Sequence, residues 1–205
     1  MGGGKKKRQG RTSNHLKMGD LAVAAAEITA GSDRVAAILG GTLVDATLIA
    51  AIMVELDDPN DAAKLFDDLR GPFSTFYSRI LAGKMLGLFD AATADQLHTI
   101  RQIRNNFAHS LANLNFTNAE VAEKCAKLPL SYHNSHQKRG ISEQRGSYED
   151  ACYGLFNKLL NHWRVKLLER EKALLKAREE GREADVRRLR DHLRIVMDAV
   201  SASHQ

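Results

Sequence analysis

The feature that most constrains this chain is a helical repeat between residues 33 and 56. The residues of one face recur there at spacings of three and four: Val35, Ile38, Thr42, Asp45, Ile49, Ile52 and Leu56. This spacing matches the 3.6-residue turn of an α-helix and excludes the two-residue repeat of a strand. Leu39, Leu43 and Ala46 widen the stripe, so we expect this helix to be buried on much of its surface.

Two glycines, Gly40 and Gly41, lie in the middle of this predicted helix. Glycine costs about 1 kcal/mol of helix propensity relative to alanine. Because it has no Cβ atom, it also lets a neighbouring element come close. The pair therefore permits the backbone of another element to approach the helix closely.

The rest of the chain also favours helices, because it has 3 prolines in 205 residues and few runs of strand-forming residues. The predicted helices span about 20–30, 33–56, 61–69, 73–87, 93–112 and 148–180, with a last helix after Gly181. The fold class is therefore all-α, a helical bundle with a long C-terminal helical extension. The predicted parts are a disordered basic arm (1–18), a helical domain (19–127), a polar loop (128–147) and C-terminal helices (148–205).

The last predicted helix carries an apolar stripe with coiled-coil spacing. Its members are Val186, Leu189, Leu193, Val196 and Val200. Spacings of three, four, three and four make two heptads of a seam, which favours a dimer or another homo-oligomer. The alternative is a helix that packs its stripe on the core of its own chain.

The charge of the chain is concentrated in the N-terminal arm. The net charge is +5, and Lys5, Lys6, Lys7, Arg8 and Arg11 carry five positive charges with no acid among them. Without these five, 25 basic residues remain against 25 acidic ones. Contact with nucleic acid through Lys5, Lys6, Lys7 and Arg8 is therefore possible. The alternatives are a solvated arm or a cloning remnant.

The cysteine pattern and the hydropathy pattern indicate a cytoplasmic protein. The 2 cysteines, Cys125 and Cys152, do not make a disulfide framework, which favours a reducing compartment. The sequence contains no run of about 18 apolar residues, so we expect no membrane span. Neither a CxxC pair nor a phosphate-binding glycine loop is present, so we expect no metal and no cofactor.

Two charged residues interrupt apolar stripes. On the helix at 93–112 the apolar stripe includes Leu97, Ile100 and Phe107, and position 104 of the same stripe is an arginine. Asp45 has the complementary position on the helix at 33–56. Because an unpaired buried charge is costly, we expect a structural ion pair between Asp45 and Arg104, with Asp33 as a competing partner for Arg104.

A second stripe on the same helix forms a polar face. It comprises His98, Arg101, Asn105 and His109. Positions separated by three or four residues share one face of a helix. Imidazole, amide and guanidinium groups on one face can bind phosphate and transfer protons. The alternative is a cluster that caps the end of the helix by hydrogen bonds.

The segment 100–110 (IRQIRNNFAHS) resembles the signature of the mannitol operon repressor (MltR-like) family. Shorter pieces at 32–34, 43–45, 71–74 and 79–88 agree in order, although the family usually has lysine at the position of Arg79. The motif residues are Asp33, Arg34, Asp45, Arg104, Asn105, Phe107 and His109. The resemblance covers about residues 31–117. It implies an all-helical fold and a role in transcription regulation, in which a regulatory protein partner is at least as plausible as direct DNA contact.

A wider resemblance concerns Arg104, Asn105 and His109 alone. They are similar to the Arg-x4-His motif of HEPN-domain proteins, many of which are ribonucleases. That likeness implies metal-independent RNA cleavage, in which His109 acts as acid or base and Arg104 stabilises charge on phosphate. Sites of this kind generally form across a dimer. A ribonuclease is therefore the alternative function.

Overall fold

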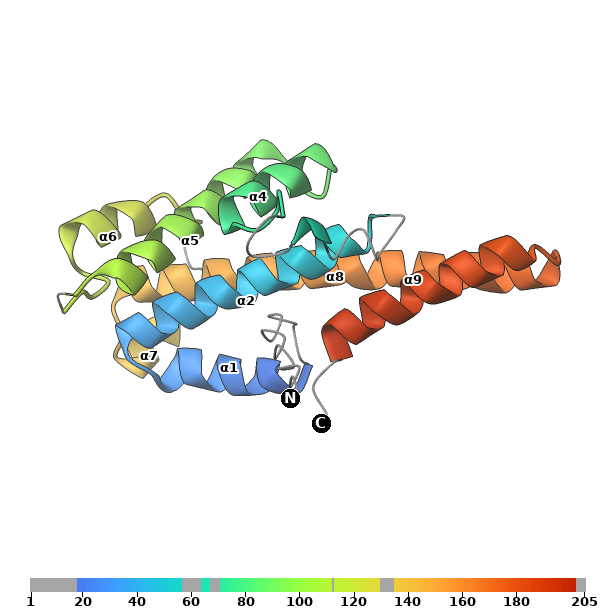
Figure 1. Cartoon of the computed structure of the whole chain (residues 1–205). Coiled ribbons are helices and arrows are strands. Elements are labelled where there is room, and N and C mark those ends of the chain that lie inside the picture. Colours follow the sequence, from blue (N-terminus) through green and yellow to red (C-terminus); the bar gives the residue numbers. More distant parts are fainter. Residues whose placement is uncertain (1–17, 57–63, 67–70, 112, 130–134, 202–205) are drawn as a thin grey trace, which may run out of the picture.

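A computed structural model of the chain describes residues 18–56, 64–66, 71–111, 113–129 and 135–201. Its helices are α1 (Met18–Ala30), α2 (Asp33–Met53), α4 (Phe76–Met85), α5 (Ala91–His109), α6 (Ala119–Cys125), α7 (Ser135–Arg139), α8 (Glu143–Glu179) and α9 (Glu183–Ser201). No strand occurs among these residues, so the predicted all-α bundle is confirmed (Figure 1). The predicted arm, apart from Met18, and most of the predicted helix at 61–69 lie outside the described residues.

Helices α2 and α8 lie side by side and run in the same direction (Figure 1). Near the start of both helices, the Tyr148 hydroxyl donates a hydrogen bond to the Ala37 carbonyl at 2.7 Å. Further along, Arg170 Nε donates to the Val54 carbonyl at 2.9 Å. Helices α4 and α5 lie on one side of this pair, and α1 lies on the other (Figure 1). The α2–α8 pair is therefore the central element of the fold, against which the other helices pack.

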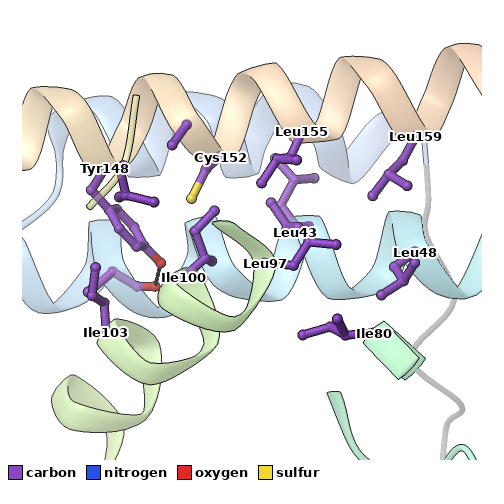
Figure 2. Packing of buried hydrophobic residues seen from close by; sticks show 14 of the residues in the cluster. Leu43, Leu48, Ile80, Leu97, Ile100, Ile103, Tyr148, Cys152, Leu155 and Leu159 are labelled. Atoms are coloured by element: carbon purple, nitrogen blue, oxygen red, sulfur yellow. Dashed lines mark hydrogen bonds between the residues drawn. The ribbon is translucent and has the colours of Figure 1, made fainter. Parts of the chain in front are cut away.

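The buried face of α2 is not the one that the larger side chains predicted. Small residues, among them Ala36 and Ala37, face the core, whereas Val35 and Thr42 of the predicted stripe are exposed. The small side chains of α2 allow α5 and α8 to pack closely against it, and this packing buries the backbone of α2 on that face. Figure 2 shows Leu43 of α2 beside Leu97 of α5 and Leu155 of α8, and Leu48 of α2 on the side of Ile80 from α4.

Two helices approach the glycine pair closely, but the nearest atoms belong to their side chains and not to a backbone. A Cβ atom on Gly40 would lie 3.2 Å from Cys152 Sγ and from Tyr148 Cε1. A Cβ atom on Gly41 would lie 2.8 Å from Cβ and Cγ of Arg104. Gly40 therefore admits α8, and Gly41 admits α5.

The predicted polar loop at 128–147 is wrong in two places. Residues 135–139 form the short helix α7, and α8 begins at Glu143, five residues before the predicted start at Tyr148. Ser142 caps α8 by accepting a hydrogen bond from the Arg145 backbone N–H at 3.2 Å. Polar residues of the first turns then become buried through ion pairs, which a reading of hydrophobicity cannot anticipate.

The most deeply buried of these ion pairs surround Glu149, whose side chain is 2% exposed. Its carboxylate accepts from Arg139 Nη1 at 2.6 Å and from Arg145 Nε at 2.7 Å. Arg145 also donates to Asp33 Oδ1 at 3.1 Å and to the Ile28 carbonyl at 2.9 Å. The network joins α1, α2, α7 and α8. Asp33, expected as a competing partner of Arg104, is thus paired with Arg145.

The two C-terminal helices form a hairpin. Gly181, with φ of +68°, separates them at the predicted break, and α9 returns along α8 (Figure 1). On α9, Val186 is buried and Leu193 packs against a cluster that contains Trp163 and Leu167. The described part of the α9 stripe therefore packs on its own chain, as in the second interpretation of the sequence. The side chains of residues 196–200 lie outside the described part.

Helix α2 is also long and apolar enough to cross a membrane by length and composition alone. In the fold, 61% of its most apolar window is buried inside the protein. A core helix of a soluble protein meets the same two criteria, so this finding is weak evidence about location in either direction.

A methyl group at Gly41 would overlap the side chain of Arg104. Gly41→Ala should destabilise the protein by about 1–3 kcal/mol, because the new methyl group overpacks against the Arg104 stem. Gly154→Ala is the matched control, because Gly154 is exposed on α8 with no atom within 4 Å of a Cβ there. The control should stabilise by about 0.5–1 kcal/mol through helix propensity. Urea unfolding of both variants measures the difference, and equal stability of the two would contradict the contact.

Candidate functional site

Helix α5 presents an apolar face to the core and a polar edge to α2 and α4. Its first turn is capped by Asp90, which accepts from the Thr93 backbone N–H at 2.9 Å. Leu97, Ile100 and Phe107 are buried as predicted. Ile103, one residue earlier than the predicted position 104, is also buried, so Arg104 is half-buried at the edge of the stripe. The candidate site lies along this edge.

Asp45 pairs with Arg79 of α4, so the predicted ion pair between Asp45 and Arg104 is wrong. Arg79 Nη1 lies 2.7 Å from Asp45 Oδ2, and the two side chains are 9% and 22% exposed. Asp45 Oδ1 is buried without a hydrogen-bond partner. Arg79 is held in place because it also donates to the carbonyls of Phe73 at 2.8 Å and Ser74 at 2.9 Å. A guanidinium fixed at three points is the better-positioned partner.

Burial shifts the protonation equilibrium of the Asp45 carboxyl group. Burial raises the pKa of Asp45 above its ordinary value of 3.8, and the charges of Arg79 and Arg104 oppose part of that rise. The folded chain therefore binds this proton more tightly than the unfolded chain. The stability that Asp45 contributes through this proton is complete below pH 3.8 and is lost as the pH rises through the raised pKa.

The aliphatic part and the guanidinium of the Arg104 side chain make different contacts. The aliphatic stem crosses Gly41 of α2, and Nη1 donates to Asn105 Oδ1 at 3.0 Å. Long basic side chains commonly bury their methylene groups and keep the charge near water. Arg104 therefore packs α5 against α2 and is itself half-buried. We call the following residues the α2–α5 polar cluster: Asp45 of α2, Arg104 and Asn105 of α5, and Arg79, which reaches Asp45 from α4.

Asp33 and Arg34, two further motif residues, bind the backbone at and just after the C-terminal end of α5. Arg34 Nη1 donates to the carbonyls of Phe107 and Ser110, each at 2.9 Å. Asp33 Oδ2 accepts from the Phe116 backbone N–H at 3.0 Å, and the rings of Phe107 and Phe116 lie 4.9 Å apart. Residues 73 to 83 positions apart are thus brought together at the start of α2. His109 lies at this end of α5 and is exposed.

The predicted polar face of α5 divides into two groups. His98 and Arg101 contact Tyr77 of α4: the two rings are 5.3 Å apart, and Arg101 Cζ lies 5.4 Å from the Tyr77 ring centroid. Burial and the neighbouring Arg101 lower the pKa of His98, so its imidazole is neutral at pH 7. Asn105 instead contacts Arg104, and His109 is exposed at the helix end. His98 is therefore an aromatic packing partner of Tyr77 at this pH.

Neither cysteine offers reactive chemistry. Cys125 and Cys152 are both buried, and burial raises the pKa of the Cys125 thiol to about 12. A thiol needs its thiolate form to act as a nucleophile or a metal ligand. Within the ranges that the structure describes, no group of three or more His, Cys, Asp or Glu residues could hold a metal ion.

Sequence reasoning missed two residues of this region. Arg79 appeared in the sequence only as a replacement for the lysine of the resembled family, and nothing in its spacing marked it as the partner of Asp45. Tyr77 gave no signal, because a lone tyrosine on a short helix looks like an ordinary surface residue. Both contacts depend on where α4 lies relative to α2 and α5, which local periodicity does not specify.

A double-mutant cycle tests the corrected ion pair. Asp45→Ala should destabilise the protein by about 3–5 kcal/mol, because Arg79 is then left buried without its carboxylate. Combining it with Arg79→Met should show a coupling energy of about 1–3 kcal/mol, and combining it with Arg104→Met should show much less. Thermal or urea unfolding of the five variants supplies the values. Stronger coupling to Arg104 than to Arg79 would restore the pair expected from the sequence.

Comparisons with protein-family models, with curated proteins and with solved structures found no match to this chain. The likeness to the mannitol operon repressor family therefore rests on the motif residues alone. What that likeness implies about function is a proposal.

Proposed function

We propose that this chain is a cytoplasmic transcriptional regulator or co-regulator that acts mainly through contacts with a protein partner. The proposal follows the resemblance to the mannitol operon repressor family. The observation that carries it is an exposed apolar stripe on α4, directly beside the motif helix α5. The basic residues Lys5, Lys6, Lys7 and Arg8 add a possible nucleic-acid contact, outside the described residues.

The motif residues support a protein-binding role because most of them hold the fold together. Asp45 pairs with Arg79, Arg34 binds the end of α5, and Phe107 is in the core. Side chains engaged in this way position a surface and do not themselves reach a substrate. The motif is therefore consistent with a rigid scaffold that presents the neighbouring helix α4.

The exposed stripe on α4 has the composition of a protein interface. Tyr77, Leu81 and Met85 follow one another at spacings of four, and Met85 is 88% exposed. Leu86 is exposed beside them, and Arg101 of α5 stacks on Tyr77. Exposed apolar patches mark interaction sites, and interfaces are enriched in Tyr, Met and Arg. A partner that covers this stripe is the occupant that the regulatory role requires.

Complementation of a strain that lacks the chain tests this role. Loss of the chain should change the transcript level of a defined operon, and the wild-type chain should restore it. Leu81→Glu with Met85→Glu should fail to restore it, because two carboxylates on the stripe oppose burial against a partner. The matched control is Val23→Glu, which changes an exposed apolar residue on α1 that belongs to neither exposed stripe. Unchanged transcripts in the deletion strain, or full restoration by the α4 variant, would refute the proposal.

The second candidate function is a HEPN-type metal-independent ribonuclease. The observation that favours it is the hydrogen bond between Arg104 and Asn105, which orients the half-buried Arg104 on the helix that ends at the exposed His109. An arginine and a histidine are the groups that such cleavage uses for charge stabilisation and proton transfer. The site would need a substrate phosphate to lie between them.

Labelled RNA separates the two functions. Under the regulatory proposal, purified protein leaves RNA intact in the presence of EDTA, and His109→Ala behaves identically. A ribonuclease would instead cleave RNA with EDTA present and lose that activity in His109→Ala by about a hundredfold or more. His98→Ala serves as the control, because His98 packs on Tyr77 and is not part of the Arg-x4-His motif.

A further inference from the structure

The outer face of α8 exposes three large apolar side chains beyond the packed body. Val165, Leu168 and Leu175 are 45%, 55% and 57% exposed. The residues that α8 buries in the hairpin include Trp163, Leu167 and Ala177. With 3.6 residues per turn, the three exposed positions point to the opposite side of α8 from these buried ones. They therefore form a stripe that no described element of the chain covers.

The spacing of this stripe is that of a coiled coil. Val165 and Lys172 take the first core position, a, of two successive heptads, and Leu168 and Leu175 take the second, d. A β-branched residue at a with leucine at d favours a parallel pair of helices. A single lysine at a costs stability but specifies the register and the number of helices. All four side chains are exposed.

The charges beside the stripe favour a second copy in the same orientation. Arg164 and Glu171 occupy the g positions, and Glu169 and Lys176 occupy the e positions, all exposed. In a parallel pair, g of one helix meets e of the next heptad on the other. Arg164 then faces Glu169 of the second copy, and Glu171 faces Lys176, so every flanking pair is attractive. Glu169 also lies 3.2 Å from Lys166 of its own chain, an exposed contact of little strength.

The antiparallel arrangement fails on the same residues. Placing Val165 opposite Leu175 of a second copy would bring Glu171 beside Glu171 and Glu169 beside Glu169. Like charges at these positions oppose association. Shifting the register by one heptad pairs charges favourably, but it places Leu168 opposite Glu179 in one direction and Leu175 opposite Lys158 in the other. Only the parallel arrangement satisfies the apolar stripe and the charges together.

We propose that the outer face of α8 is a self-association surface, on which a second copy of this chain packs in parallel through two heptads. The inference is independent of the proposed regulatory function. It replaces the α9 stripe, whose described part faces the core, as the dimer contact. A seam of two heptads is short for an isolated coiled coil, but this part of α8 is already held in place by its contacts with the end of α2 and with α9.

The mass of the full chain in solution, measured by sedimentation over a concentration series, tests the surface. The wild type should form a dimer. Leu168→Glu with Leu175→Glu should weaken dimerisation by at least about a hundredfold, because four carboxylates enter the two d layers. The matched control is Met85→Glu, which changes an exposed apolar residue on α4 and should leave the dimer unchanged. Circular dichroism checks that each variant keeps its helices.

A charge exchange tests the orientation without relying on loss of function. Glu171→Lys alone and Lys176→Glu alone should each weaken the dimer by about tenfold, because each creates two like-charge contacts. The double variant restores both contacts in a parallel dimer and should recover the wild-type affinity. In an antiparallel register that pairs Glu171 with Arg178 and Glu169 with Lys176, the double variant stays weak. A monomeric wild type, a dimer that survives the paired glutamates, or a double variant that does not recover overturns the proposal.

Discussion

The close contact at Gly40 and Gly41 is the constraint on which the rest of the structure depends. Gly40 admits Cys152 and Tyr148 of α8, and Gly41 admits the stem of Arg104 from α5. Because neither glycine has a side chain, these groups lie directly against α2, and the three helices approach more closely than a side chain at either position would permit. The Tyr148 hydroxyl then reaches the Ala37 carbonyl, which fixes the position of α8 along α2. The location of the α2–α5 polar cluster follows from this geometry.

Buried charges specify how the helices outside this contact are placed. Asp45 and Arg79 join α4 to α2, and Glu149 with Arg145 and Arg139 joins α7 and α8 to the α1–α2 corner. A buried ion pair gives little net stability, but it is costly to break by misplacing one partner. Arrangements of the helices that separate these groups are therefore disfavoured. The ion pairs specify where the helices lie more than they raise the free energy of unfolding.

The two exposed apolar surfaces lie on different helices and suit different roles. The stripe on α4 lies beside the motif helix and contains Tyr77 and Met85, whereas the stripe on α8 has heptad spacing and charges that match a second copy. A chain that dimerises through α8 would present two α4 stripes in one particle. Two linked binding surfaces raise the apparent affinity for a partner that is itself multivalent, without any new contact.

The sequence by itself determined the fold class, most helix positions, the break at Gly181 and the close approach at Gly40 and Gly41. These features depend on local spacing, on helix propensity and on the absence of a side chain. Each of these properties can be read from a short segment of the sequence. Only the tertiary structure decided that Asp45 pairs with Arg79, that Val35 and Thr42 face outward, and that the described part of the α9 stripe packs on its own chain. Periodicity specifies which residues share a face of a helix. Which face meets which neighbour depends on the packing of helices that are distant in sequence, and a long arginine side chain can satisfy any carboxylate that this packing brings within its reach.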